Sequence, residues 1–189
     1  MLIDLFKIPV YSIDLMLFNQ KLLDYCFYLK DNDKECIKKS NIGGWQSKNL
    51  INDNELKFLI NEIEINSNNF SKLINLKNNL KVSNIWININ YFKDFNKLHH
   101  HSNTLLSGVY YIKTPDDCGN ITFNHPSFDT IQYDWNESVI KKYDNYNSAE
   151  FNLKSIKSKM YIFPSWLNHS VQPNLNKNEE RISISFNLK

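Results

Sequence analysis

Three consecutive histidines at positions 99–101 stand just before "LLSGVYYI", an apolar and aromatic run that is typical of a buried strand. The histidines lie inside the chain, so they are not a terminal purification tag. In an extended segment alternate side chains share a face, so His99 and His101 point one way and His100 the other. Two imidazoles on one face could bind a metal ion, but a third ligand must come from elsewhere. A solvated polar turn is the alternative.

Two more histidines occur later in the chain. His169 follows the strand-like run "MYIFPSWLN", where an exposed polar tail is not expected. It is therefore the candidate third ligand. His125, in "FNHP", is expected to be a turn residue after a strand, with a place on a pocket rim as the alternative.

Arg181 is the only arginine in the chain, and it opens an alternating strand-like run. A planar guanidinium suits a task that lysine does poorly, such as holding a carboxylate by two parallel hydrogen bonds. The competing interpretation is a surface ion pair with Glu179 or Glu180.

The elements that must position these residues change character along the chain. After Val82 come short runs rich in aromatic and β-branched residues, namely "VSNIWININYF", "LLSGVYYIK", "GNITFNH", "MYIFPSWL" and "RISISFNL". Apolar and polar side chains alternate in 85–90 and in 182–187, as in strands with one core face and one polar face. This pattern predicts a mainly β fold, a small barrel or two-sheet jelly roll whose polar faces line an interior cavity.

The N-terminal part is predicted to be mostly helical and to pack on the outside of one sheet. An edge strand is expected at 5–13, and an amphipathic helix at 14–33 with Asp14 as its N-cap. The stretch 41–53 is typical of a loop, and 54–80 predicts two helices broken by Asn and Ser.

Bulk properties indicate one domain, 1–189, with a helical buttress at 1–82 and a jelly-roll core at 83–189. No apolar run approaches the roughly 20 residues of a membrane span, and the first residues do not form a secretory leader, so a cytoplasmic protein is expected. The three cysteines match no zinc or redox spacing and are expected to be reduced. A net charge of +2 with scattered lysines argues against nucleic-acid binding.

Five ordered motifs together carry a family resemblance: the histidine pair, "LSGVYYI", "GNITF", "FPSWLNHSVQPN" and "RISISFN". The C-terminal half of the chain resembles the Fe(II)- and 2-oxoglutarate-dependent oxygenases. The similarity is closest to a branch of bacteria and cyanobacterial phages that shares "HxHPNSxLSGVYY" and "FPSWLxHxVxPN". The resemblance implies a double-stranded β-helix, which is a jelly roll, and a cytoplasmic location in the host cell if a phage encodes the protein.

The same resemblance implies a metal site made of His99, His101 and His169. His101 stands where the family usually has a carboxylate, so the site would be more positive by one charge. Two other arrangements stay open: His101 and Asn103 as an HxN pair, or water in place of a ligand at position 101. His100 is expected to face away.

Arg181 matches the family residue that binds the distal carboxylate of 2-oxoglutarate. Ser183, on the same strand face, is a second donor, and Tyr111 matches a position that binds this carboxylate in related hydroxylases. Asn90 and Asn187 are weaker candidates for the pocket wall.

The implied reaction is oxidative decarboxylation of 2-oxoglutarate by O2 to succinate and CO2, coupled to hydroxylation of a substrate. The substrate could be a small molecule or a protein side chain; the oligomeric state is open, with a homodimer among the options. Segments 43–45, with Trp45, and 127–151 are candidates for contact with substrate, although Trp45 is expected rather to cover the core edge. The rival functions are a cupin-like three-histidine dioxygenase without 2-oxoglutarate and a non-catalytic jelly-roll binding protein.

Overall fold

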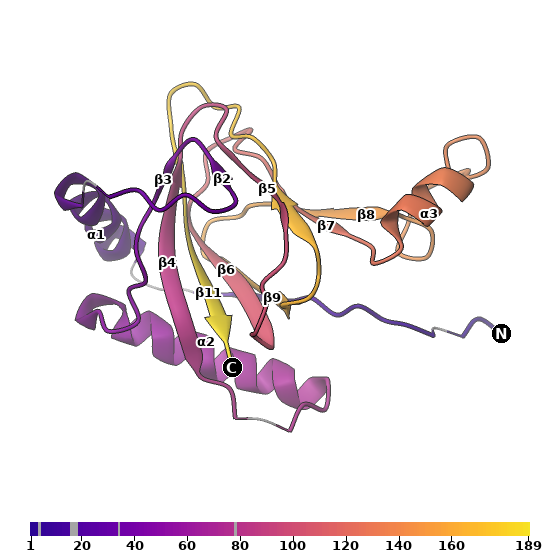
Figure 1. Ribbon diagram of the computed structural model, residues 1–189, viewed down its shortest axis with the longest axis horizontal. Helices are drawn as coiled ribbons and strands as arrows, with labels where there is room; N and C mark the ends of the chain where they lie inside the picture. Colours follow the sequence, from indigo (N-terminus) through magenta and orange to yellow (C-terminus); the bar gives the residue numbers. More distant parts are fainter. Residues whose placement is uncertain (4, 16–18, 34, 78) are drawn as a thin grey trace.

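The computed structural model describes residues 1–3, 5–15, 19–33, 35–77 and 79–189. Two antiparallel sheets face each other, with helices on the outer side of one of them (Figure 1). In spatial order, the six-stranded sheet consists of β1 (Tyr11–Asp14), β9 (Lys159–Pro164), β6 (Leu106–Lys113), β11 (Arg181–Leu188), β4 (Val82–Asn90) and β3 (Trp45–Gln46). The five-stranded sheet consists of β2 (Asn41–Ile42), β5 (Phe95–His99), β10 (His169–Val171), β7 (Ile121–Asn124) and β8 (Glu150–Leu153). The predicted two-sheet jelly roll is confirmed.

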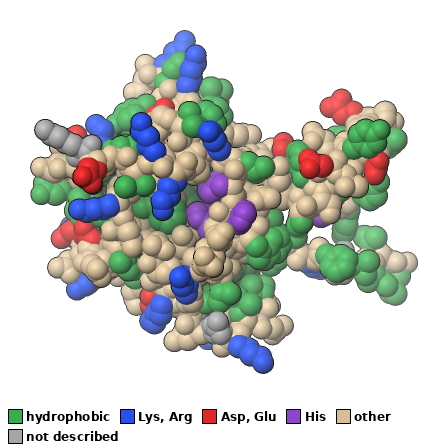
Figure 2. All heavy atoms as spheres, viewed as in Figure 1, with side chains coloured by type: hydrophobic (Ala, Val, Ile, Leu, Met, Phe, Trp, Pro, Cys, Tyr) green, Lys and Arg blue, Asp and Glu red, His purple; other side chains and the backbone are tan. Residues whose placement is uncertain are grey.

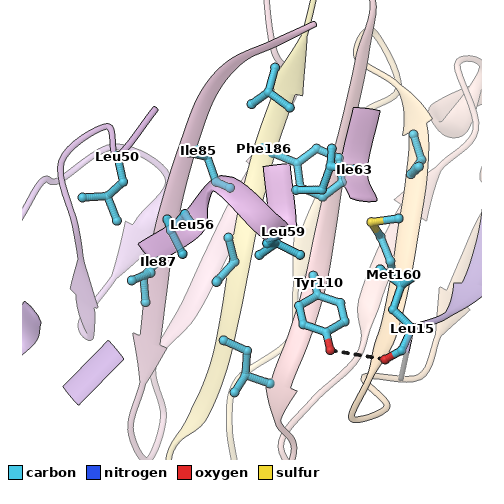
Figure 3. Packing of buried hydrophobic residues seen from close by; sticks show 14 of the residues in the cluster. Leu15, Leu50, Leu56, Leu59, Ile63, Ile85, Ile87, Tyr110, Met160 and Phe186 are labelled. Atoms are coloured by element: carbon cyan, nitrogen blue, oxygen red, sulfur yellow. Dashed lines mark hydrogen bonds between the residues drawn. The ribbon is translucent and has the colours of Figure 1, made fainter. Parts of the chain in front are cut away.

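The larger hydrophobic core lies between the six-stranded sheet and the helices. Along β4 the isoleucines at 85, 87 and 89 are all fully buried. Figure 3 shows Leu59 and Ile63 packed over this face of the sheet, beside Phe186 of β11. The alternation of apolar and polar residues therefore aims the apolar half of each strand at the helices, and leaves the polar half for the space between the sheets.

A smaller core lies between the two sheets. It contains buried residues from β6, β7 and β9, namely Val109, Tyr111, Ile121, Phe123, Tyr161 and Phe163, together with Leu167. Consecutive tyrosines of β6 join different cores, because Tyr110 packs with the helices and Tyr111 with this inner cluster. The two side chains therefore lie on opposite faces of the sheet, as expected for neighbours in a strand.

The expected first strand and first helix both begin later than predicted. Strand β1 does lie at a sheet edge, but it begins at Tyr11, and 5–10 form no regular element. Asp14 ends this strand and pairs with Lys159 at 2.9 Å, so it is not the N-cap of a helix. Helix α1 spans Asn19–Asn32, and the predicted helical residues 16–18 lie outside the described residues.

The prediction of two helices in 54–80 is wrong. A 3-10 turn, η1 (Asn54–Leu56), leads into one continuous helix, α2 (Lys57–Leu73). Its asparagines do not break it, because Asn66 and Asn68 direct their side-chain amides to the carbonyls four residues earlier, at 2.8 Å each. Asn68 also exchanges two hydrogen bonds with the backbone of Leu80, which fixes the entry into β4.

Five short strands and one projecting segment were not predicted. The stretch expected to be a loop contains β2 and β3, while β5, β8 and β10 have too few residues for a clear period. Between β7 and β8 a segment with the short helix α3 (Phe128–Asp134) extends away from the body of the molecule (Figure 1). Within the described ranges, no helix has both the length and the apolar character to cross a membrane.

Candidate active site

A cavity of about 730 Å³ lies between the sheets, and its floor is the polar face of β4 and β11. The strands are paired so that polar residues stand side by side along this floor. From one end to the other the pairs are Arg181 with Asn90, Ser183 with Asn88, Ser185 with Trp86, and Asn187 with Asn84. The weaker wall candidates Asn90 and Asn187 both line the cavity, as do Ser183 and Tyr111. Histidine side chains gather in the hollow of the face shown in Figure 2.

Three of the predicted residues, His99, His101 and His169, form a compact cluster. One ligand atom from each lies within 4.8 Å of the others, which suits a metal ion. The sheet produces this meeting, because β5 ends at His99, β10 begins at His169, and the two residues are direct partners in the antiparallel ladder. The His101 backbone N–H donates to the Ser165 carbonyl at 2.9 Å, which returns the chain toward the pair.

Hydrogen bonds to the backbone orient two of the rings. His99 Nδ1 lies 2.7 Å from the Lys97 carbonyl oxygen, and His169 Nδ1 lies 2.9 Å from that of Leu167. A carbonyl only accepts, so each Nδ1 carries the proton and each Nε2 keeps its lone pair. This tautomer is the one that presents Nε2 to a metal ion.

Burial keeps the three imidazoles neutral. It is the largest cause that lowers the pKa of His99, that of His101 to about 4, and that of His169 to about 3. The charges of the neighbouring histidines lower the values further. At neutral pH the cluster therefore consists of three uncharged imidazoles, each of which can serve as a metal ligand.

These pKa values predict an acid-sensitive metal-free protein. The pKa of a histidine is near 6.5 in the unfolded chain, whereas that of His169 in the folded protein is about 3. As the pH falls below 6.5, the unfolded state therefore binds more protons than the folded state, and the free energy of unfolding decreases. The slope should reach about 1.4 kcal/mol per pH unit for this residue alone. Denaturant unfolding in chelator at pH 7, 6 and 5 measures it. A His169→Gln variant should show a shallower slope, and an identical slope would contradict the prediction.

The other histidines do not join the cluster. His100 is exposed and contacts the Ser102 hydroxyl at 3.4 Å. His125 accepts a hydrogen bond from the Ser127 backbone N–H at 3.0 Å, so the predicted turn role is confirmed and the pocket-rim alternative is not. Asn103, of the alternative HxN pair, is exposed at the cavity mouth with a φ of 60°.

At the opposite end of the floor Arg181 is buried, with 1% of its surface exposed. Its Nη1 donates to the carbonyls of Cys118 and Gln172, the second at 3.0 Å. Its Nη2 is buried and has no partner among the described residues. The alternative prediction, that Arg181 forms a surface ion pair with Glu179 or Glu180, is wrong. Both carboxylates instead pair with Lys113, at 3.0 and 2.8 Å.

The two carbonyls that bind this guanidinium come from two backbone segments that approach each other closely at Gly119. Gly119 has a φ of 81°, and a Cβ there would lie 2.5 Å from the Gln172 carbonyl oxygen. The loop that carries Cys118 can therefore approach the Gln172 segment, and both carbonyls converge on Arg181. The orphaned Nη2 is left for a ligand.

Tyr111, on the neighbouring strand β6, lies close enough to Arg181 for the two groups to interact electrostatically. Its hydroxyl is buried and has no hydrogen-bond partner within the described part of the chain. Burial raises the pKa of Tyr111 to about 12, so the phenol stays protonated and can donate. Ser183 is its cross-strand partner on β11. A carboxylate fits this end of the cavity, because a buried cation and a phenol both lack an acceptor.

Neither predicted substrate segment lines the cavity. Trp45 is buried in the larger core, so the interpretation as a core aromatic holds; the next residues, 46–49, line the cavity instead. None of 127–151 lines it, because this segment projects from the β7 and β8 ends (Figure 1). Trp86, which was not predicted as a site residue, also lines the cavity, and its ring centroid lies 5.8 Å from that of His101. Its alternation with the isoleucines of β4 is the sequence signal that places it on the polar face.

Comparison with known proteins identifies the architecture. Residues 84–187 match the family model described as "Putative 2OG-Fe(II) oxygenase". A search of curated protein sequences gives no match. The fold is similar to that of a Pseudomonas putida prolyl-4-hydroxylase, with a TM-score of 0.67, 11% identity, and coverage of 96% of this chain and 92% of that one.

Two other solved structures share the double-stranded β-helix. HygX from Streptomyces hygroscopicus, with nickel and 2-oxoglutarate bound, has a TM-score of 0.64, 9% identity, and coverage of 96% and 82%. The viral collagen prolyl hydroxylase of Paramecium Bursaria Chlorella virus-1, in complex with 2-oxoglutarate, has a TM-score of 0.59, 14% identity, and coverage of 95% and 94%. Because the family model matches more than half of the chain, this protein belongs to the 2OG-Fe(II) oxygenase family.

Proposed function

We propose that this protein is an Fe(II)- and 2-oxoglutarate-dependent oxygenase that hydroxylates its substrate. The observation that carries the proposal is the combination, in one cavity, of three neutral imidazoles and a buried guanidinium with an unpaired Nη2. The first group suits a metal ion and the second suits a carboxylate. Prolyl hydroxylases among the structures with the same fold support hydroxylation as the reaction to test first.

His99, His101 and His169 would hold Fe(II). When bound, the metal supplies the activation of O2 and the oxidation that couples decarboxylation of 2-oxoglutarate to the attack on the substrate. The chain's part is to hold three ligands from one side and to leave the remaining positions open. It also limits water beside the cluster, where the Phe163 ring packs 4.7 Å from that of His169.

Arg181 and Tyr111 would hold the distal carboxylate of 2-oxoglutarate. The free Nη2 and the free phenol hydroxyl are both donors, and Ser183 adds a hydroxyl on the same face. The Arg181 guanidinium is fixed before a ligand arrives, since its Nη1 is already bonded to two carbonyls. Binding therefore costs little side-chain ordering.

The two rival functions use less of this arrangement. A cupin-like three-histidine dioxygenase needs the histidines but leaves the buried, unpaired Arg181 Nη2 without a purpose. A non-catalytic binding protein needs neither feature. An orphaned buried cation is costly to keep, and that cost favours the 2-oxoglutarate-dependent reaction.

An anaerobic titration of metal-free protein with Fe(II) and 2-oxoglutarate tests the proposal. We expect a visible charge-transfer band that requires both components, followed by succinate release when O2 is admitted. Iron binding without such a band would support the three-histidine rival. Binding of neither component would leave the fold with a non-catalytic use.

A further inference from the structure

The cavity has an outer part that the metal and 2-oxoglutarate would not fill. Arg181 and Tyr111 occupy one end of the floor, and the His101 ring lies near Trp86, which is four residues from Asn90 along β4. Beyond Trp86 the floor continues to Asn84 and Asn187. We call this end of the cavity, with the adjoining residues 46–49 and the two lysines next to the histidines, Lys39 and Lys97, the outer compartment.

The charge around the outer compartment has one sign. Four lysines line the cavity, namely Lys39, Lys48, Lys97 and Lys189, and no Asp or Glu does so among the described residues. In Figure 2 several Lys or Arg side chains lie near the hollow that holds the histidines, mainly above it and to its left. The ion pairs formed within the described ranges involve other lysines, so Lys39, Lys48 and Lys97 remain exposed and unneutralised.

The neutral groups of the compartment also favour an acceptor-rich ligand. Asn187 accepts from the Ser107 hydroxyl through Oδ1 at 2.8 Å, so its Nδ2 remains free to donate into the cavity. Gln46, Asn49 and Asn84 add further amides. Trp86 is only partly buried and offers an apolar surface next to the His101 ring.

The cluster itself does not offset this positive charge. Three imidazoles are neutral, whereas a carboxylate ligand would contribute one negative charge at the centre of the cavity. The dianion 2-oxoglutarate would balance a divalent metal, and Arg181 and the lysines would remain. A cleft lined by charges of one sign raises the local concentration of ions of the opposite sign, so this cavity should attract anions.

We propose that the outer compartment binds a substrate that carries an oxyanion, a carboxylate or a phosphate group, through Lys39, Lys48 and Lys97. This inference rests on the proposed function, because the molecule bound here is a substrate only if the protein is an oxygenase. The oxyanion could belong to a small molecule or to an acidic peptide, since both present the same group to a lysine ammonium.

Fluorescence of Trp86 tests this without metal or 2-oxoglutarate. In the full chain with Trp135→Phe and Trp166→Phe, the remaining tryptophans are Trp86 and the buried Trp45. Acrylamide quenching is measured with added inorganic phosphate, with the peptide acetyl-(Glu-Gly)3-amide, and with its Gln counterpart. We expect phosphate or the acidic peptide to protect Trp86, and the stronger of the two identifies the source of the oxyanion.

The matched variant is Lys39→Gln, Lys48→Gln and Lys97→Gln together, all at exposed positions. It should weaken the protecting interaction by about tenfold at low ionic strength. Three results would each overturn the inference. Neither oxyanion protects Trp86, the Gln peptide protects it as well as the Glu peptide does, or the protection survives in the triple variant. The iron and 2-oxoglutarate titration fails or succeeds independently, so the two proposals are separable.

Discussion

Replacement of Arg181 by methionine is expected to abolish measurable binding of 2-oxoglutarate while the metal site survives. The guanidinium is fully buried, and its Nη2 is a donor without a partner among the described residues. Truncation of one member of a buried charged pair costs about 2–5 kcal/mol, which is between about 30-fold and a few thousand-fold in affinity. Arg181→Lys should recover only a small part, because an ammonium cannot bond both carbonyls and a carboxylate in the same planar geometry.

Isothermal titration of metal-loaded protein with 2-oxoglutarate measures this effect, and thermal unfolding monitors the fold. The second measurement matters because the variant leaves the Cys118 and Gln172 carbonyls unpaired, which should cost about 1–3 kcal/mol each in stability. Lys113→Met is the matched control, since Lys113 is a cation on the neighbouring strand whose partners are Glu179 and Glu180. An affinity within about threefold of wild type in Arg181→Met would mean that the cosubstrate does not use this end of the cavity.

The cavity floor could be predicted from the sequence because its two strands are long and amphipathic. In β4 and β11 every second residue is apolar and packs against the helices, so the intervening Asn88, Asn90, Arg181 and Ser183 had to share the other face. The same reasoning separates Tyr110 from Tyr111. The local alternation of apolar and polar residues is sufficient to predict which face a side chain lies on where a strand has eight or nine residues and a core on one side.

The wall opposite the floor could not be derived in this way. Strand β10 has three residues and a register shift after His169, so no period reveals its pairing with β5. The resemblance placed His169 near His99, but the contact itself depends on a long-range ladder that local pattern does not encode. The same limit explains why the prediction that 127–151 contacts substrate found no support in the cavity lining. These residues lie on a segment whose direction is set by the β7 and β8 ends.

Replacement of His101 by alanine is expected to lower Fe(II) affinity by more than about 100-fold, because loss of a direct ligand should exceed the 10–100-fold cost of losing a group behind one. His100→Ala is the matched control, since it removes an exposed imidazole of the same segment that lies outside the cluster. Metal titration of the two variants in parallel distinguishes a ligand from a neighbour. Equal affinities would show that position 101 leaves the metal unligated, with water in its place.

His101→Glu then tests what the unusual third imidazole does. A carboxylate at this position restores the usual two-histidine, one-carboxylate set, and its charge should strengthen Fe(II) binding relative to His101→Ala. The same charge should weaken 2-oxoglutarate binding by about tenfold relative to wild type, because the dianion then approaches a site that is less positive by one charge. If instead the glutamate variant binds both tightly, the third histidine is not needed for cosubstrate affinity. Its neutrality would then matter mainly for the charge that the outer compartment presents to the substrate.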